Sequence, residues 1–170
     1  MPKAENQKLS SCVLLDAGVF IGALLGGDPR HQEARLLVEQ ARRAELLACT
    51  TAGILSEVYG ALTWEKAQPR HHPAQAANAV CLLVEPPSAI KVLEEGLEVI
   101  LRALELAASH KLTARRIHDA RHAATALVAG VHEVYTYDIH DWQVFEADGL
   151  RVVGPESVLA RGKVANSRQS

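Results

Sequence analysis

The chain has 170 residues, 48% of them hydrophobic, which suits a single domain with its own core. Its formal net charge of -2 excludes a strongly basic surface of the kind that binds nucleic acid through overall charge alone. Three widely spaced cysteines, Cys12, Cys49 and Cys81, lie in apolar runs and predict buried thiols in a reducing compartment rather than disulfides.

The beginning of the chain carries no sign of a targeting segment. Residues 1–10 are polar and precede no signal-peptide core, and no apolar run reaches the roughly 18 residues that a membrane helix needs. We therefore expect a cytoplasmic protein that does not enter a membrane. The domain is expected over residues 11–160, with a flexible segment at 1–10 and a flexible tail at 161–170.

Strands and helices are predicted to alternate along the first half of the chain. A short strand is expected at 13–15 and an apolar helix at 18–25, which ends at the breaker Gly26-Gly27-Asp28-Pro29. The next expected elements are an amphipathic helix at 31–44, a strand at 46–49, a helix that Thr50 or Thr51 caps, and, after a proline-bounded loop, a helix at 74–83.

The second half continues the alternation. Strands are expected at 90–93, 134–137 and 150–153, and helices at 97–108 and 117–129, the latter ending at Gly130. No internal repeat or second-domain linker interrupts this order. The sequence therefore predicts an α/β protein, a three-layer α/β/α sandwich with a mostly parallel central sheet.

Acidic residues stand beside apolar segments throughout the chain. Asp16 and Asp138 are expected just after strands, whereas Glu57 and Asp119 are expected in the early turns of helices. Ligands of open parallel sheets gather outside the carboxyl ends of the strands, so we expect most of these acids at one edge. Asp141 is either a further member of the group or the N-cap of a short helix at 142–146.

A group of carboxylates at the edge of a core requires a positive partner. Hard oxygen ligands with no accompanying cysteine favour Mg²⁺ or Mn²⁺ over zinc. Each acid alone could be a helix cap or a surface ion pair, but capping does not explain why Asp16 and Asp138 both end apolar strands.

Four segments, in order, give the chain a resemblance to a known family. They are residues 13–21 (VLLDAGVFI), 51–58 (TAGILSEV), 119–127 (DARHAATAL) and 135–142 (YTYDIHDW). With these segments the sequence resembles the PIN-domain ribonucleases, in particular the VapC-type toxins of VapBC toxin–antitoxin systems. Trp142 stands where the family usually has phenylalanine.

The resemblance implies a PIN-like fold and a site that cleaves RNA. It implies that Mg²⁺ or Mn²⁺ is bound by Asp16, Glu57, Asp119, and one or both of Asp138 and Asp141. Thr136 would support the last carboxylate or a metal-bound water. Hydrolysis would leave a 5′-phosphate and a 3′-hydroxyl, with Asp16, Glu57, Asp119 and Asp138 as the catalytic acids.

The expected partners follow from the same resemblance. They are an RNA substrate, a cognate antitoxin protein and a second copy of the chain in a homodimer. Phosphate contacts are predicted for arginines near the acids, which would offset repulsion between the carboxylates and RNA: Arg30, Arg115, Arg116 and Arg121.

Three alternatives remain open at the level of the sequence. One is a stand-alone PIN nuclease in RNA processing, and another is a non-catalytic PIN-like RNA-binding module, although that reading would require a missing acid. The third is a zinc peptidase, because His118 and His122 have the i, i+4 spacing of a zinc-binding helix. This third reading leaves Asp16, Glu57 and Asp138 unexplained.

Overall fold

The computed structural model describes residues 11–158, and within them five strands form one sheet. The strand order is β3-β2-β1-β4-β5, and all neighbouring strands are parallel. The strands are β1 (Val13–Leu15), β2 (Ala48–Thr51), β3 (Lys91–Leu93), β4 (Glu133–Tyr135) and β5 (Arg151–Val153). The limits expected at 160 for the domain and at 1–10 and 161–170 for the flexible segments lie outside the described residues.

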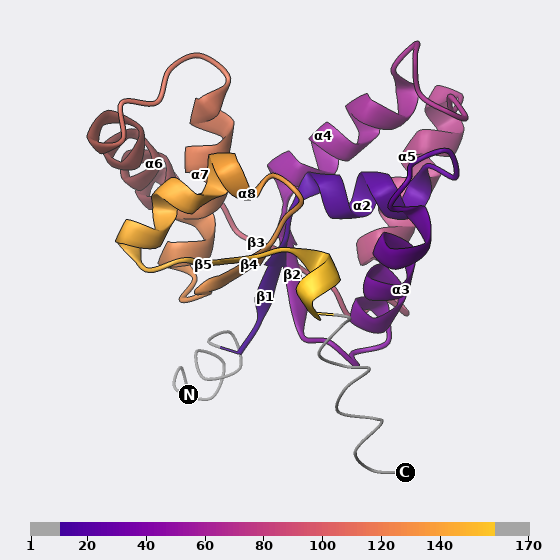
Figure 1. Ribbon diagram of the computed structural model, residues 1–170, viewed down its shortest axis with the longest axis horizontal. Coiled ribbons are helices and arrows are strands. Elements are labelled where there is room, and N and C mark those ends of the chain that lie inside the picture. Colours follow the sequence, from indigo (N-terminus) through magenta and orange to yellow (C-terminus); the bar gives the residue numbers. More distant parts are fainter. Residues whose placement is uncertain (1–10, 159–170) are drawn as a thin grey trace.

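Helices cover both faces of this sheet, as Figure 1 shows. Before β3 the chain forms α2 (Ala17–Leu24), α3 (His31–Arg42), α4 (Ala52–Thr63) and α5 (Pro73–Val84). After β3 it forms α6 (Leu97–Ser109), α7 (Arg116–Val128), α8 (Ile139–Trp142) and the 3-10 helix η1 (Gln143–Asp148). The predicted three-layer α/β/α sandwich is confirmed.

The strand order explains how the helices divide between the faces. From β1 the chain moves outward to β2 and β3, and it then crosses back to place β4 and β5 on the other side of β1. Parallel crossovers are right-handed, so reversing the direction moves the connecting helices to the opposite face. Helices α2 to α5 therefore cover one face, and α6, α7 and α8 cover the other (Figure 1).

The reversal makes a topological switch point between β1 and β4. In open α/β sheets, ligands bind outside the carboxyl ends of the strands at this kind of point. Asp16 directly follows β1, and Thr136 directly follows β4, so both stand at the switch point.

Two strands differ from their predicted positions. The second strand runs from Ala48 to Thr51 rather than over 46–49, because Cys49, Thr50 and Thr51 pair with β3. The fourth strand ends at Tyr135, two residues before the expected limit. There the Thr136 hydroxyl accepts a hydrogen bond from the amide of Asp138 at 2.9 Å, which turns the chain away from the sheet.

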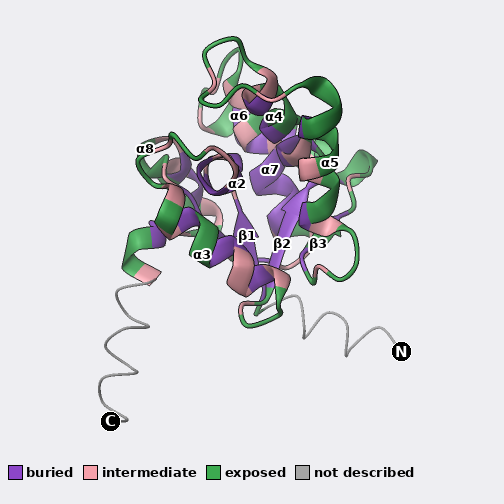
Figure 2. Cartoon of the chain, turned by 90° about the vertical axis from the view of Figure 1, so that its right-hand side faces the viewer, coloured by how far each residue is buried: buried purple, intermediate pink, exposed green. Residues whose placement is uncertain are grey.

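The core lies between the sheet and the two helix layers. Figure 2 shows the buried strands in the middle of the molecule and the exposed residues on the outer sides of the helices. Leu14 and Leu15 of β1 are fully buried. Cys12 and Cys49 are buried as expected, but Cys81 is exposed because it lies on the outer side of α5. None of the helices between residues 11 and 158 is long and apolar enough to cross a lipid bilayer.

Candidate active site

Asp16 and Thr136 are joined across the switch point. The Thr136 hydroxyl donates a hydrogen bond of 2.7 Å to Oδ2 of Asp16, and Oδ1 accepts a second one of 2.8 Å from the amide of Ala17. Asp16 is thus the N-cap of α2, while Thr136 is fully buried. Two strands that are neighbours in space but 120 residues apart in the chain hold this carboxylate in one orientation.

The surroundings of Asp16 disfavour its negative charge. Burial raises the pKa of the Asp16 carboxyl group, and the hydrogen bonds from Thr136 and Ala17 oppose this shift. The negative charge of Glu57 adds to the increase in this pKa. A cation near both carboxylates would relieve the repulsion.

Glu57 lies on α4 and is held by a histidine of α7. Nε2 of His122 is 2.8 Å from Oε1 of Glu57, and Nδ1 of the same ring is 2.9 Å from the hydroxyl of Thr51 at the end of β2. The hydroxyl also accepts a hydrogen bond from the amide of Ile54, so Thr51 is the N-cap of α4. The ring of His122 is buried, while the side chain of Glu57 is 42% exposed at the surface.

Asp119 is linked to Asp141 through an arginine. Nε of Arg116 is 3.2 Å from Oδ2 of Asp119, and Nη1 is 3.3 Å from Oδ1 of Asp141. Burial raises the pKa of Asp119, Arg116 opposes the shift, and the charge of Asp141 adds to it. Asp119 and Asp141 therefore share one electrostatic environment.

Asp138 and Asp141 have different positions. Asp138 occupies the N-cap position of α8 but its exposed side chain makes no capping hydrogen bond. Asp141 lies within α8 and is half-buried against Arg116, so it is not the N-cap of a helix at 142–146. The structure thus brings Asp141 rather than Asp138 into contact with the group around Asp119.

An open hollow of about 470 Å³ contains two of the acids. It is lined by Gly53, Ser56, Glu57, Arg115, His118, Asp119 and Arg121. A side chain at position 53 would overlap Arg121 and would place Cβ 2.6 Å from Cε1 of His122. The glycine therefore allows the first turn of α4 to approach α7 closely, above the carboxyl ends of the strands.

The donor set is compatible with Mg²⁺ or Mn²⁺. Among residues 11–158, no three carboxylate, histidine or cysteine side chains form a closed metal cage. Mg²⁺ does not need one, since it usually keeps several waters and binds one or two carboxylates together with substrate phosphates. Carboxylates that repel each other in pairs, Asp16 with Glu57 and Asp119 with Asp141, are suitable ligands for such an ion.

Three of the four predicted RNA-contacting arginines already have acidic partners. Arg30 pairs with Asp28 at 3.1 Å, Arg116 pairs with Asp119 and Asp141, and Arg121 pairs with Glu95 at 3.5 Å. Arg115 is exposed at the N-cap position of α7 and lines the hollow. Arg115 is thus the best placed of the four to meet a polyanion.

The geometry argues against the zinc-peptidase alternative. His118 is exposed, whereas both ring nitrogens of buried His122 are engaged, one with Thr51 and the other with Glu57. Neither nitrogen of His122 is available to a zinc ion unless one of these bonds breaks.

Our interpretation of the sequence missed the structural contribution of Thr51 and His122. Thr51 was expected at most to cap a helix, and His122 was considered only as a zinc ligand. The sequence did contain a signal for His122. It lies three residues after Asp119, and residues at i and i+3 share one face of a helix, so the histidine is on the same face as a predicted metal ligand.

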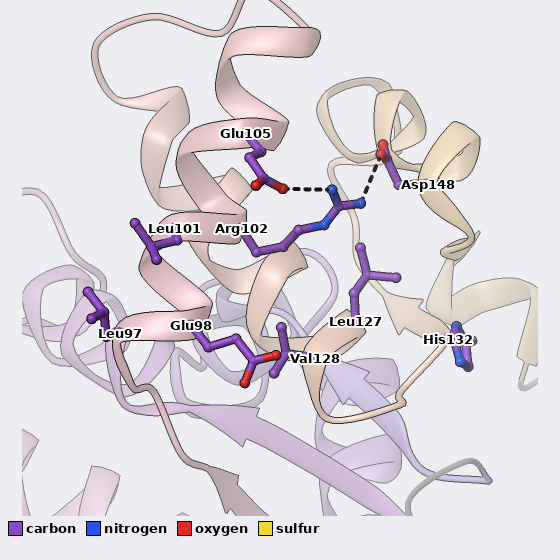
Figure 3. Close-up of a pocket in the computed structure, with 9 residues that line it drawn as sticks. All are labelled: Leu97, Glu98, Leu101, Arg102, Glu105, Leu127, Val128, His132 and Asp148. Atoms are coloured by element: carbon purple, nitrogen blue, oxygen red, sulfur yellow. Dashed lines mark hydrogen bonds and ion pairs between the residues drawn. The ribbon is translucent and has the colours of Figure 1, made fainter.

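A larger hollow, of about 770 Å³, lies away from these acids. Figure 3 shows it between α6, the end of α7 and η1, with Arg102 directed between Glu105 and Asp148. Four apolar and five polar or charged residues line it, and none of them is a predicted catalytic acid: Leu97, Glu98, Leu101, Arg102, Glu105, Leu127, Val128, His132 and Asp148. The smaller hollow is therefore the candidate active site.

Solved structures share this fold at low sequence identity. The Sarcin-Ricin loop cleaving toxin VapC20 of Mycobacterium tuberculosis aligns with a TM-score of 0.61 and 19% identity, covering 82% of this chain and 96% of that chain. For VapBC-1 of nontypeable Haemophilus influenzae the values are 0.59 and 16%, with 85% and 98% covered. For VapBC2 of Rickettsia felis, bound to a DNA fragment from its promoter, they are 0.58 and 13%, with 84% and 98% covered.

A comparison of sequences, rather than of structures, identifies the family of the chain. None of the curated proteins matches the chain significantly. Residues 13–143, however, match the sequence model of the PIN domain. This match spans well over half of the chain and includes β1, β4, Asp16, Glu57, Asp119, Asp138 and Asp141. The protein belongs to the PIN domain family.

Proposed function

We propose that this protein is a Mg²⁺- or Mn²⁺-dependent endoribonuclease. The observation that carries the proposal is the convergence of Asp16, Glu57, Asp119 and Asp141, in a PIN domain, around the carboxyl ends of β1 and β4. These acids come from four separate elements and meet only in the folded chain. Two of them have a raised pKa because burial and a neighbouring carboxylate disfavour their charge.

Each residue has a distinct role in this proposal. Asp16, Glu57, Asp119 and Asp141 hold the cation, with exposed Asp138 at the edge of the site. When bound, the ion supplies an activated water and neutralises charge on the phosphodiester. Thr136 orients Asp16 through its hydroxyl, and Arg115 contacts a phosphate at the rim of the hollow.

We further propose that the protein acts as the toxin of a VapBC-type pair, in the cytoplasm, restrained by an antitoxin. Support comes from the shared fold with structures of VapBC assemblies. A second source of support is exposed apolar surface on the helices: Trp64 at the end of α4 is 57% exposed, and Leu82 of α5 is 47% exposed. Both side chains are accessible to a partner protein because they do not pack in the core.

The nuclease proposal is tested with purified protein and a panel of tRNA, rRNA fragments and mRNA. We expect cleavage with Mn²⁺ or Mg²⁺, none in EDTA, and products with 5′-phosphate ends. Asp16→Asn and Asp119→Asn each remove a charge with little change of shape. We expect either change to lower the cleavage rate at least ~100-fold, because stabilisation by a bound metal is worth several kcal/mol.

The control is Asp148→Asn, since Asp148 pairs with Arg102 and His110 far from the acids. This variant should cleave RNA like the wild type. Cleavage that persists in EDTA, or that both site variants retain in full, would contradict the proposal. The toxin role is tested by expressing the chain with and without the product of the neighbouring upstream gene, and it fails if expression alone does not slow growth.

A further inference from the structure

We infer that His122 is a positioning residue that fixes Glu57 for cation binding, and that Thr51 fixes His122 in turn. This inference rests on the proposed function. Nothing else in the site holds the Glu57 side chain: of the described residues, only His122 is hydrogen-bonded to its carboxylate. The link joins α7 on one face of the sheet to α4 on the other.

The direction of the hydrogen bonds follows from chemistry. An ionised carboxylate only accepts hydrogen bonds, so Nε2 of His122 carries a hydrogen and donates it to Oε1 of Glu57 at 2.8 Å. Thr51 accepts a bond from the amide of Ile54, and its hydroxyl hydrogen is directed to Nδ1 of the neutral ring.

The environment makes this support effective. The His122 side chain is 2% exposed and therefore has little freedom to rotate, whereas Glu57 is 42% exposed and has a long, flexible side chain. The bond uses Oε1, and no described residue is hydrogen-bonded to Oε2 of Glu57. With Oε1 held by His122, the second oxygen of Glu57 is left free to bind a hydrated cation in the hollow that Glu57 lines.

His122 also lies near a second acid of the site. It follows Asp119 by three residues on α7, so both side chains share one face of that helix. Partners that orient metal ligands typically contribute 10–100-fold to metal affinity. We expect a contribution of this size here, made through the orientation of Glu57.

Two substitutions separate the two bonds of His122. In His122→Gln the side-chain amide nitrogen takes the place of Nε2 and keeps the donor to Glu57. In His122→Asn the shorter amide takes the place of Nδ1, so it keeps the contact with Thr51 and loses Glu57. Both variants bury a neutral amide at the same position, which makes them matched for the general cost of replacing the ring.

The measurement is Mn²⁺ affinity by isothermal titration calorimetry on the full chain without RNA. We expect His122→Asn to weaken binding about 10–100-fold and His122→Gln to stay within about threefold of the wild type. His132→Asn, an exposed histidine in the loop before β4, is the surface control and should bind Mn²⁺ like the wild type. Melting temperatures of all variants are recorded beside the affinities.

A double-mutant cycle distinguishes positioning from a general structural effect. In the Glu57→Gln background, His122→Asn should cause no further loss of Mn²⁺ affinity, because its effect passes through Glu57. An equal loss in both backgrounds, or Mn²⁺ binding by His122→Asn as tight as that of the wild type, would overturn the inference.

The same data separate this inference from the nuclease proposal. If the wild type binds Mn²⁺ in a manner that depends on His122 and Glu57 but cleaves no RNA, the nuclease proposal fails and the role of His122 stands. If the wild type cleaves RNA with Mn²⁺ and His122→Asn binds the ion normally, only the role of His122 fails. A wild type that binds no Mn²⁺ contradicts both.

Discussion

At the scale of single residues, Arg116 contacts two acids of the site at once. It was expected to contact RNA, but its guanidinium group bridges Asp119 and Asp141. In the absence of a metal ion it supplies the positive charge that these two carboxylates need. Each of these contacts is partly exposed, so each is worth about 1 kcal/mol or less.

The bridge leads to a prediction for Arg116→Gln. In EDTA we expect the melting temperature to fall by about 2–4 °C, since two carboxylates lose their partner. On addition of Mn²⁺ the melting temperature of the variant should rise more than that of the wild type, because the ion no longer competes with the arginine. Differential scanning fluorimetry across a Mn²⁺ series measures both effects.

The matched control is Arg102→Gln. Arg102 also pairs with two acids, Glu105 and Asp148, but away from the site. Its variant should melt lower in EDTA and show the Mn²⁺ response of the wild type. An Mn²⁺ response of Arg116→Gln no larger than that of this control would contradict the idea that the arginine and the cation share the carboxylates.

At the scale of secondary-structure elements, the close approach of α4 to α7 builds the hollow. Thr51 starts α4 as its N-cap, and Gly53 follows within the first turn, where α7 contributes Arg121 and His122. Tertiary packing thus decides the residue type at position 53, although glycine is a poor helix former.

Gly53→Ala is expected to be destabilising despite the higher helix propensity of alanine. The new Cβ would lie 2.6 Å from Cε1 of His122, a buried ring that cannot move away. We expect a loss of about 1–3 kcal/mol in the free energy of unfolding, as for other overpacked sites, and weaker Mn²⁺ binding because His122 shifts. Urea denaturation and calorimetry measure the two quantities.

Gly60 provides the control within the same helix. A Cβ at this exposed position would meet no atom within 4 Å. Gly60→Ala should therefore raise the free energy of unfolding by about 0.5–1 kcal/mol through backbone entropy alone. Opposite signs for the two glycines are expected; a gain of stability in both would mean that α4 and α7 are not closely packed in solution.

At the scale of the whole molecule, one helix presents an apolar stripe to solvent. Leu97, Ile100, Leu101 and Leu104 follow the i, i+3, i+4, i+7 spacing on α6, and their exposed fractions are 75%, 42%, 54% and 53%. Val128, 40% exposed, joins Leu97 and Leu101 at the larger hollow. An apolar stripe of this length is typical of a surface that a partner covers.

We predict that the chain forms a homodimer through this stripe. Leu101→Lys should convert the dimer to a monomer, because a charge at the centre of an apolar contact is desolvated without a partner. Size-exclusion chromatography with light scattering should then show half the mass of the wild type. Leu82→Lys, at an exposed leucine of α5 on the other face, should leave the mass unchanged. A wild type that is monomeric at all concentrations contradicts the prediction.

The sequence predicts the fold of this molecule more completely than it predicts the site. Helix periodicity and short apolar runs placed most elements to within one or two residues, since burial of one helix face or one strand is a local property of the chain. The limits of β2 and β4 were wrong because pairing with β3 and the turn at Thr136 set them. Trp64 and Tyr59 are large aromatic side chains of a kind that usually packs in a core, yet they are 57% and 37% exposed.

The sequence by itself determined a parallel α/β sandwich and the acids at the carboxyl ends of its strands, because residue pattern and strand direction suffice for both. Only the tertiary structure decided that Asp141, through Arg116, stands with Asp119 while Asp138 faces solvent. It alone also brought His122 to Glu57 and Thr51, over 65 and 71 residues of chain. Contacts at such separations depend on the reversal of strand order at β1, which no local pattern encodes.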